Sequence, residues 1–276
     1  MTQPDSIRAK LNFLVPKDEY AHQRPVYVAS EGGADAGLYM TGEFALTEVD
    51  VLNARQLPDV PTLDREGFVL LDHPTKVGDF FDDDEIATTY EGEVKQLVAN
   101  ATGASRVVVF DHTRRGDSRD ARAQRGIREP SKVMHNDYTD ASAIQRVRDI
   151  LPDEADDLLS RRFSIVNVWR PINRPVETAP LVLCDARTLD PANLLAAERR
   201  AKERIGELTL VTHNPAQRWM YYPQMTPDEA LLITTYDTAN GGRARFSVHG
   251  AFDDPSSPPD APPRESIETR AFAFFE

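Results

Sequence analysis

Cysteine is the scarcest reactive residue of this chain, because Cys184 is the only one among 276 residues. A single cysteine excludes an internal disulfide and a metal cage of several thiolates, and it is compatible with the reducing cytoplasm, where we expect the protein to be located. Long apolar runs are also missing, and residues 1–14 lack a basic segment followed by an apolar one. The sequence therefore predicts a protein that neither spans a membrane nor is exported.

Basic residues are fewer than acidic residues in this chain. The chain has 32 Lys and Arg against 45 Asp and Glu, which gives a formal net charge of -13. Nucleic acid is not an expected partner, because phosphate binding needs clustered basic residues. An anionic ligand would need a local group of arginines, and one such group is Arg114, Arg115, Arg119, Arg122, Arg125 and Arg128. These arginines suggest an anionic substrate, although a solvated loop is the commoner meaning of a basic run.

Short apolar segments separated by turns predict a mainly β protein with flanking helices. Strands are expected at 106–111, 132–138, 163–170, 181–184, 208–213, 217–222, 230–236, 243–248 and 266–275. Helices are expected at 84–100, ending near Gly103, and over 140–162 with a break near Pro152. Five prolines between Asp253 and Pro263 exclude regular structure there. Crossover loops in place of βαβ units favour a double-stranded β-helix, that is, a jelly roll of the cupin-like kind.

The run His135-Asn136-Asp137 lies where a strand is expected to end. Side chains two apart on a strand share a face, so His135 and Asp137 can both enter the mouth of the barrel while Asn136 points away. His249, expected at the end of another strand, is a possible third ligand, and His213 is its main competitor. Two imidazoles and one carboxylate on one face of a metal leave positions for a cosubstrate and oxygen, as in non-haem Fe(II) oxygenases.

A second candidate site leads into the last expected strand. Alternation places Arg264, Ser266 and Arg270 on one side of it. A guanidinium binds a carboxylate bidentately and a hydroxyl adds a donor, so Arg264 and Ser266 form a candidate clamp for the distal carboxylate of 2-oxoglutarate. Glu268 shares this face, and an ion pair between Glu268 and Arg270 would leave Arg264 as the clamp.

Six runs carry a family pattern: Val107–Thr113 (VVVFDHT), His135–Asp137 (HND), Asn167–Ile172 (NVWRPI), Asn214–Trp219 (NPAQRW), Met225–Ala230 (MTPDEA) and Pro263–Glu268 (PRESIE). Together they resemble the cephem 7α-methoxylase and AsaB-like hydroxylase/desaturase family over about residues 60–276. The resemblance implies an Fe(II)- and 2-oxoglutarate-dependent oxygenase of secondary metabolism that uses O2. It matches His135, Asp137 and His249 to the iron ligands, and Arg264 with Ser266 to the 2-oxoglutarate clamp.

The resemblance also implies roles for two residues of the expected strand at 163–170. Asn167 and Arg170 sit where the family keeps polar residues facing the cavity, so we assign them to the cosubstrate or the substrate. Members of such a family hydroxylate, desaturate or cyclise different small molecules, so the reaction outcome and the substrate do not transfer. We expect one oxygenase domain over 1–276, with 1–80 covering the substrate and 104–276 forming the core. The segments 112–131 and 253–263 are also expected at the barrel mouth.

Two other classes of protein remain open. A cupin-like metal-dependent hydrolase or isomerase could use the same three ligands without 2-oxoglutarate, in which case Arg264 would be dispensable and zinc would support activity. A barrel that binds a small molecule without chemistry would keep its ligand affinity after replacement of His135 or Asp137. The sequence does not reveal the oligomeric state.

Overall fold

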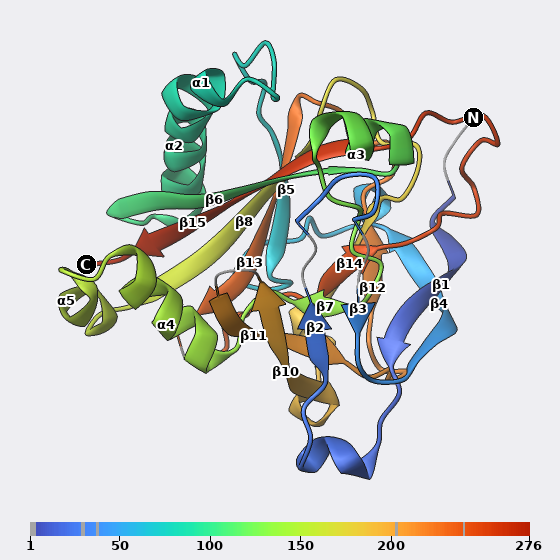
Figure 1. Cartoon of the computed structure of the whole chain (residues 1–276), viewed down its shortest axis with the longest axis horizontal. Helices are drawn as coiled ribbons and strands as arrows, with labels where there is room; N and C mark the ends of the chain where they lie inside the picture. Colours follow the sequence, from blue (N-terminus) through green and yellow to red (C-terminus); the bar gives the residue numbers. More distant parts are fainter. Residues whose placement is uncertain (1–3, 29–30, 37–38, 202–203, 240) are drawn as a thin grey trace.

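A computed structural model describes residues 4–28, 31–36, 39–201, 204–239 and 241–276. The described residues form a ten-stranded sheet and a five-stranded sheet with a few helices around them (Figure 1). Leu183 and Met220 of the large sheet pack with Trp169, Leu231 and Ile233 of the small sheet, so one part of the core lies between the two sheets. The predicted mainly β architecture with flanking helices is confirmed.

The large sheet has the strand order β1-β4-β12-β9-β14-β7-β11-β10-β2-β3. Its strands are β1 (Ser6–Leu14), β2 (Val26–Val28), β3 (Tyr39–Met40), β4 (Phe44–Asn53), β7 (His135–Asn136), β9 (Leu181–Cys184), β10 (Leu194–Ala201), β11 (Arg204–Val211), β12 (Trp219–Tyr221) and β14 (His249–Ala251). Neighbours pair antiparallel except β10 with β2 and β12 with β4. Four strands of this sheet come from the first 53 residues, so the amino-terminal region extends the sheet.

The small sheet has the order β5-β13-β8-β15-β6 and is antiparallel throughout. Its strands are β5 (Phe68–Asp72), β6 (Arg106–Gly116), β8 (Phe163–Pro171), β13 (Glu229–Asp237) and β15 (Glu265–Phe274). Val94 and Val98 of helix α2 (Glu91–Thr102) pack with Val166, Val168 and Ile267 of this sheet. The helix therefore covers one face of the small sheet and leaves the other face to the core and the site (Figure 1).

Both predicted helical regions are present. The first consists of α1 (Asp83–Glu85), a π-helical turn (Ile86–Tyr90) and α2. The Asp82 side chain accepts hydrogen bonds from the first turn, and Gly103 ends α2 in the left-handed region with φ 75°. The second consists of α4 (Asp140–Ile150) and α5 (Ala155–Leu159), which are separated at Pro152. The other helices are α3 (Arg119–Arg125) and the 3-10 turns Asp18–Ala21, Ala54–Gln56, Ala186–Thr188 and Pro191–Asn193.

The predicted strand at 243–248 is wrong. Ala244 donates its backbone N–H to Asp64, and Ser247 donates its own to Thr234, so this segment does not pair with a single partner strand. Regular structure begins only at His249, the first residue of β14. The segment 253–263 lacks helix and strand, as predicted. None of the helices in the described ranges is long and apolar enough to cross a membrane.

Candidate active site

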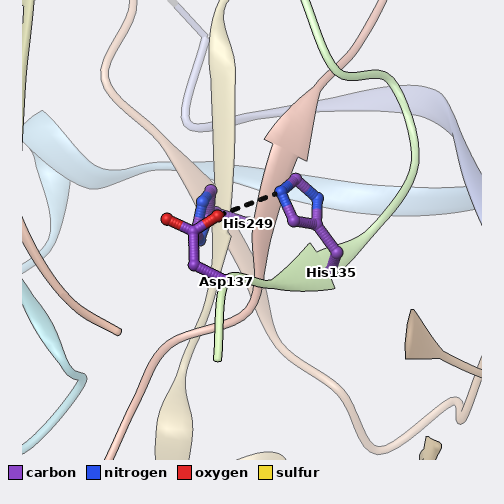
Figure 2. A group of neighbouring side chains, drawn as sticks. All are labelled: His135, Asp137 and His249. Atoms are coloured by element: carbon purple, nitrogen blue, oxygen red, sulfur yellow. Dashed lines mark ion pairs between the residues drawn. The ribbon is translucent and has the colours of Figure 1, made fainter. Parts of the chain in front are cut away.

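Two histidines and one aspartate meet on neighbouring strands of the large sheet. His249 at the start of β14 lies directly opposite His135 of β7, and Asp137 follows β7 immediately. One potential ligand atom from each residue lies within 4.8 Å of the others, and Figure 2 shows the three side chains turned toward one another. His213, the competing histidine, is exposed and packs on Phe13 instead.

The backbone fixes which ring nitrogen each histidine presents. The Nδ1 atom of His135 lies 2.7 Å from the carbonyl oxygen of Val133, and that of His249 lies 3.2 Å from the carbonyl oxygen of Ser247. A carbonyl oxygen only accepts, so each ring donates from Nδ1 and keeps the lone pair of Nε2 for a metal. Burial, and then the neighbouring His135, lower the pKa of His249 to about 4. His249 is therefore neutral at neutral pH, which is the form that binds a metal.

Arg270 of β15 joins the small sheet to this group. Its Nε donates to Asp137 Oδ2 at 2.9 Å, while Nη1 and Nη2 donate to Asp111 and Glu268 at 2.6 and 2.8 Å. Burial alone would raise the pKa of the Asp137 carboxyl, but Arg270 and the two histidines hold it well below its usual range. Asp137 Oδ1 lies 3.6 Å from His135 Nε2, so one carboxylate oxygen is held by Arg270 and the other faces the histidines.

The strands β7 and β14 approach closely beside His249. A Cβ added to Gly250 would lie 2.4 Å from Met134 Cε and 3.0 Å from the carbonyl oxygen of Val133. The end of the Met134 side chain can move, but the backbone oxygen of Val133 cannot move as freely, so glycine suits this close approach beside His249.

Arg264 and Ser266 are buried, and each has a side-chain polar atom without a hydrogen-bond partner among the described residues. Arg264 is 2% exposed, its Nη1 donates to the carbonyl oxygen of Ala179, and its guanidinium lies 5.4 Å from the Trp169 ring. Burial, and then Arg115, lower the pKa of Arg264 to about 10. Within the described part of the chain, Arg264 Nε and Ser266 Oγ have no hydrogen-bond partner. A buried guanidinium beside a free hydroxyl fits the carboxylate of a bound cosubstrate.

The structure separates Asn167 from Arg170. Asn167 of β8 lies directly opposite Arg270 of β15, on the site face, and its Oδ1 has no partner among the residues described. Arg170 lies on the helix-covered face, where its Nη2 contacts His73 at 2.8 Å and its guanidinium stacks 5.4 Å from the Tyr90 ring. The prediction that Arg170 faces the cavity is therefore wrong.

A cavity of about 460 Å³ opens beside His135 and Asp137, and its size is ordinary for a small-molecule site. His135, Asp137 and Arg270 line it together with the segments 111–115 and 125–128. Tyr27 and Glu31 of the amino-terminal region also line it, whereas no residue of the described segment 253–263 does. Two of the three segments expected at the barrel mouth therefore reach the cavity.

Two packed sheets that bring two imidazoles and one carboxylate together are typical of the class of Fe(II)- and 2-oxoglutarate-dependent oxygenases. A family profile described as "Oxidoreductase/YMDC permease-like domain" matches residues 11–274, and the chain belongs to this family. The solved structure of the iron and alpha-ketoglutarate-dependent endoperoxidase NvfI is similar, with a TM-score of 0.84 and 26% identity over 98% of each chain. The protein is thus an iron-dependent oxidoreductase that uses 2-oxoglutarate and O2, on a jelly-roll fold.

Curated relatives carry related names. The chain is 32% identical to the hydroxylase/desaturase efuI of Hormonema carpetanum, over 78% of this chain and 79% of that relative. It is 40% identical to the hydroxylase/desaturase asaB of Aspergillus flavus, over 45% of this chain and 60% of that relative. The resemblance to the AsaB-like family is confirmed. The match to asaB covers less than two thirds of the length of asaB.

Proposed function

We propose that His135, Asp137 and His249 hold the Fe(II) of this oxygenase, which hydroxylates or desaturates a small molecule and releases succinate and CO2. The observation that carries this proposal is the convergence of three ligand atoms within 4.8 Å, with both histidines tied back through Nδ1. Three protein ligands leave three positions on an octahedral ion, enough for a bidentate cosubstrate and oxygen.

The cosubstrate has a matching set of protein groups. Arg264 and Ser266 bind the distal carboxylate of 2-oxoglutarate, and Asn167 offers a further polar atom on the same side of the small sheet. When bound, iron and 2-oxoglutarate supply the oxidation of an unactivated C–H bond, which protein side chains alone do not provide. The protein orients the cosubstrate through Arg264, orients the Asp137 carboxylate through Arg270, and positions one C–H bond in the cavity.

We also propose that residues 1–276 act as one oxygenase domain and that the enzyme works in the cytoplasm. Strands β1 and β4 pair with each other and with the rest of the large sheet, which supports a single unit. Tyr27 and Glu31 line the cavity, which supports a substrate-covering role for part of the amino-terminal region. The single buried Cys184 supports a reducing compartment.

Succinate formation tests the proposed function. Protein that has been freed of metal with a chelator is mixed under argon with Fe(II), 2-oxoglutarate and each of a panel of candidate substrates. Oxygen is then added, and the succinate formed is measured. We expect oxygen-dependent succinate with Fe(II) and none with Zn(II). We expect His135→Ala to lower the rate by more than about 100-fold, because loss of a mere supporting contact to a metal ligand already costs about 10- to 100-fold. Turnover supported by zinc without 2-oxoglutarate would instead indicate a hydrolase or isomerase.

Replacing Arg264 separates cosubstrate binding from the chemical step. We expect Arg264→Gln to raise KM for 2-oxoglutarate by about 10- to 100-fold, since a charge-assisted hydrogen bond to the carboxylate is lost. Arg264→Lys keeps the positive charge but loses the paired N–H donors of the guanidinium. Its KM for 2-oxoglutarate should therefore lie between those of the wild type and Arg264→Gln. Steady-state succinate assays over a range of 2-oxoglutarate concentrations measure this effect. Arg161→Gln, at an exposed ion pair with Asp157, is the matched control, and an unchanged KM in Arg264→Gln would remove the clamp assignment.

A further inference from the structure

The cavity beside the candidate iron site is strongly cationic in a chain whose formal net charge is -13. Eight arginines and three carboxylates line it. Two of the carboxylates, Asp111 and Asp137, are both bonded to Arg270. Glu268, which is buried nearby, bonds Arg270 and Arg115. The six other arginines that line the cavity are Arg114, Arg125, Arg128, Arg146, Arg199 and Arg204.

Four of these arginines, which we call the arginine wall, are Arg128, Arg146, Arg199 and Arg204. They come from three separate parts of the fold. Arg199 and Arg204 lie on the hairpin of β10 and β11, Arg146 lies on α4, and Arg128 follows α3. A local basic run in the sequence therefore does not explain the wall, because the fold brings distant arginines to one cavity.

The hairpin directs two of its arginines into the cavity by strand alternation. Arg199 pairs with Gly206, so no side chain stands opposite it, and the Arg204 guanidinium lies 3.7 Å from the place where a Cβ of Gly206 would be. Arg199 also lies beside Tyr27 of β2, another residue that lines the cavity. The next residue, Arg200, is exposed and pairs with Glu198 instead.

The four guanidiniums of the wall share one cavity, and burial together with neighbouring arginines lowers the pKa of two of them. Burial, and then Arg115 and Arg199, lower the pKa of Arg128. Burial, and then Arg146 and Arg199, lower the pKa of Arg204. The Arg204 guanidinium lies 3.6 Å from a carboxylate oxygen of Asp149, and that of Arg146 lies 5.2 Å from the ring of Phe110. Gathering like charges in a half-buried place costs stability, so a bound anion would relieve it.

We propose that the substrate of this enzyme is an oxyanion, a small molecule with a carboxylate or phosphate group that the arginine wall binds. The inference rests on the proposed function, because it gives the substrate class for the same site. Guanidinium groups bind both kinds of oxyanion through paired N–H donors. His135 and Asp137 line the same cavity, so an anchored anionic end leaves the rest of the molecule directed toward the iron ligands. The cosubstrate is also an anion, but Arg264 and Ser266 do not belong to the wall.

Anion binding to the loaded enzyme tests the proposal. Protein saturated with Fe(II) and 2-oxoglutarate under argon is titrated calorimetrically with inorganic phosphate, with propane-1,2,3-tricarboxylate, and with the neutral triamide of that acid. We expect at least one oxyanion to bind, more weakly as salt rises, and the triamide not to bind. Arg199→Gln and Arg204→Gln should each weaken oxyanion binding by about tenfold or more. Arg200→Gln, the exposed neighbour, should change it by less than about twofold.

Each ligand and each variant in this experiment answers a different question. Tighter binding of phosphate or of the tricarboxylate identifies the kind of oxyanion. Lack of binding by both oxyanions, equal binding of the triamide, or unchanged binding in both wall variants would overturn the proposal. A parallel loss of affinity for 2-oxoglutarate in the wall variants would also overturn it, because the arginines would then serve the cosubstrate. Succinate formation by the wild type tests the proposed function separately, so failure of that function is not confused with failure of the anion site.

Discussion

His249→Ala is expected to abolish stoichiometric iron binding and to lower succinate formation by more than about 100-fold. His249 is 4% exposed, presents Nε2 to the site, and is held by the Ser247 carbonyl. No other histidine of the described residues joins His135 and Asp137 in the cluster, so no side chain is in place to substitute. Elemental analysis of purified protein and the oxygen-dependent succinate assay measure the two effects.

The matched control is His213→Ala. His213 also follows a strand of the large sheet, but it is exposed and packs on Phe13 at 5.3 Å between ring centroids. This variant should keep full iron content and activity. The ligand assignment would fail if His213→Ala lost iron while His249→Ala kept it. Circular dichroism of both variants separates loss of metal from loss of fold.

Arg270→Gln is expected to destabilise the metal-free protein by about 3–5 kcal/mol, the usual cost of removing one partner from a buried ionic network. Arg270 bonds Asp137, Asp111 and Glu268, and its loss leaves Arg115 as the remaining partner of Glu268. Urea denaturation at neutral pH measures the difference from wild type. Arg106→Gln, at an exposed pair with Glu154, should change stability little and serves as the control.

The effect of Arg270→Gln should shrink as the pH falls. Burial alone would raise the pKa of Glu268, but Arg115 and Arg270 hold it at about 2. A depressed carboxyl pKa stabilises the fold above the unfolded-state value of about 4.3, and this contribution is lost as the pH falls toward the folded-state value. The variant lacks one of the two cations that lower this pKa, so its Glu268 carboxyl takes up a proton at a higher pH than in the wild type. The difference in stability therefore narrows as the pH falls from about 4.3 toward 2. A difference that stays constant over this range would indicate lost packing instead.

The strand pattern of the second half could be predicted because its apolar segments are short and separated by clear turns. The segment 243–248 also alternates polar and apolar residues, but its backbone N–H groups bond to different parts of the chain. No local sequence pattern reveals these distant partners. The helices were predicted more closely, since Asp82 and Gly103 mark the start and end of the first one in the sequence itself. The strands β1 to β5 and β10 were not predicted. Of these, β1 is an edge strand with alternating polar and apolar residues, whereas β10 lies inside the large sheet between β11 and β2.

Part of the candidate site could also be predicted from the sequence, and part could not. His135 and Asp137 could be placed together because two residues on a strand share a face, whatever the rest of the fold does. The same parity places Asn167 and Arg170, which are three positions apart, on opposite faces of β8. The contact between Arg270 and Asp137 joins residues 133 positions apart, and only the packing of the two sheets creates it.

Gly250 makes iron affinity depend on a residue that has no atom to offer a metal. A side chain there would have to displace the end of the Met134 side chain and would press on the backbone carbonyl oxygen of Val133, two residues before His135. Arg199 and Arg204 lie at the other end of the β10–β11 hairpin from Leu210, which pairs with His135. A substitution at Gly250 would therefore act on the metal ligands through the backbone that precedes His135, whereas one at Arg199 would act on the cavity directly.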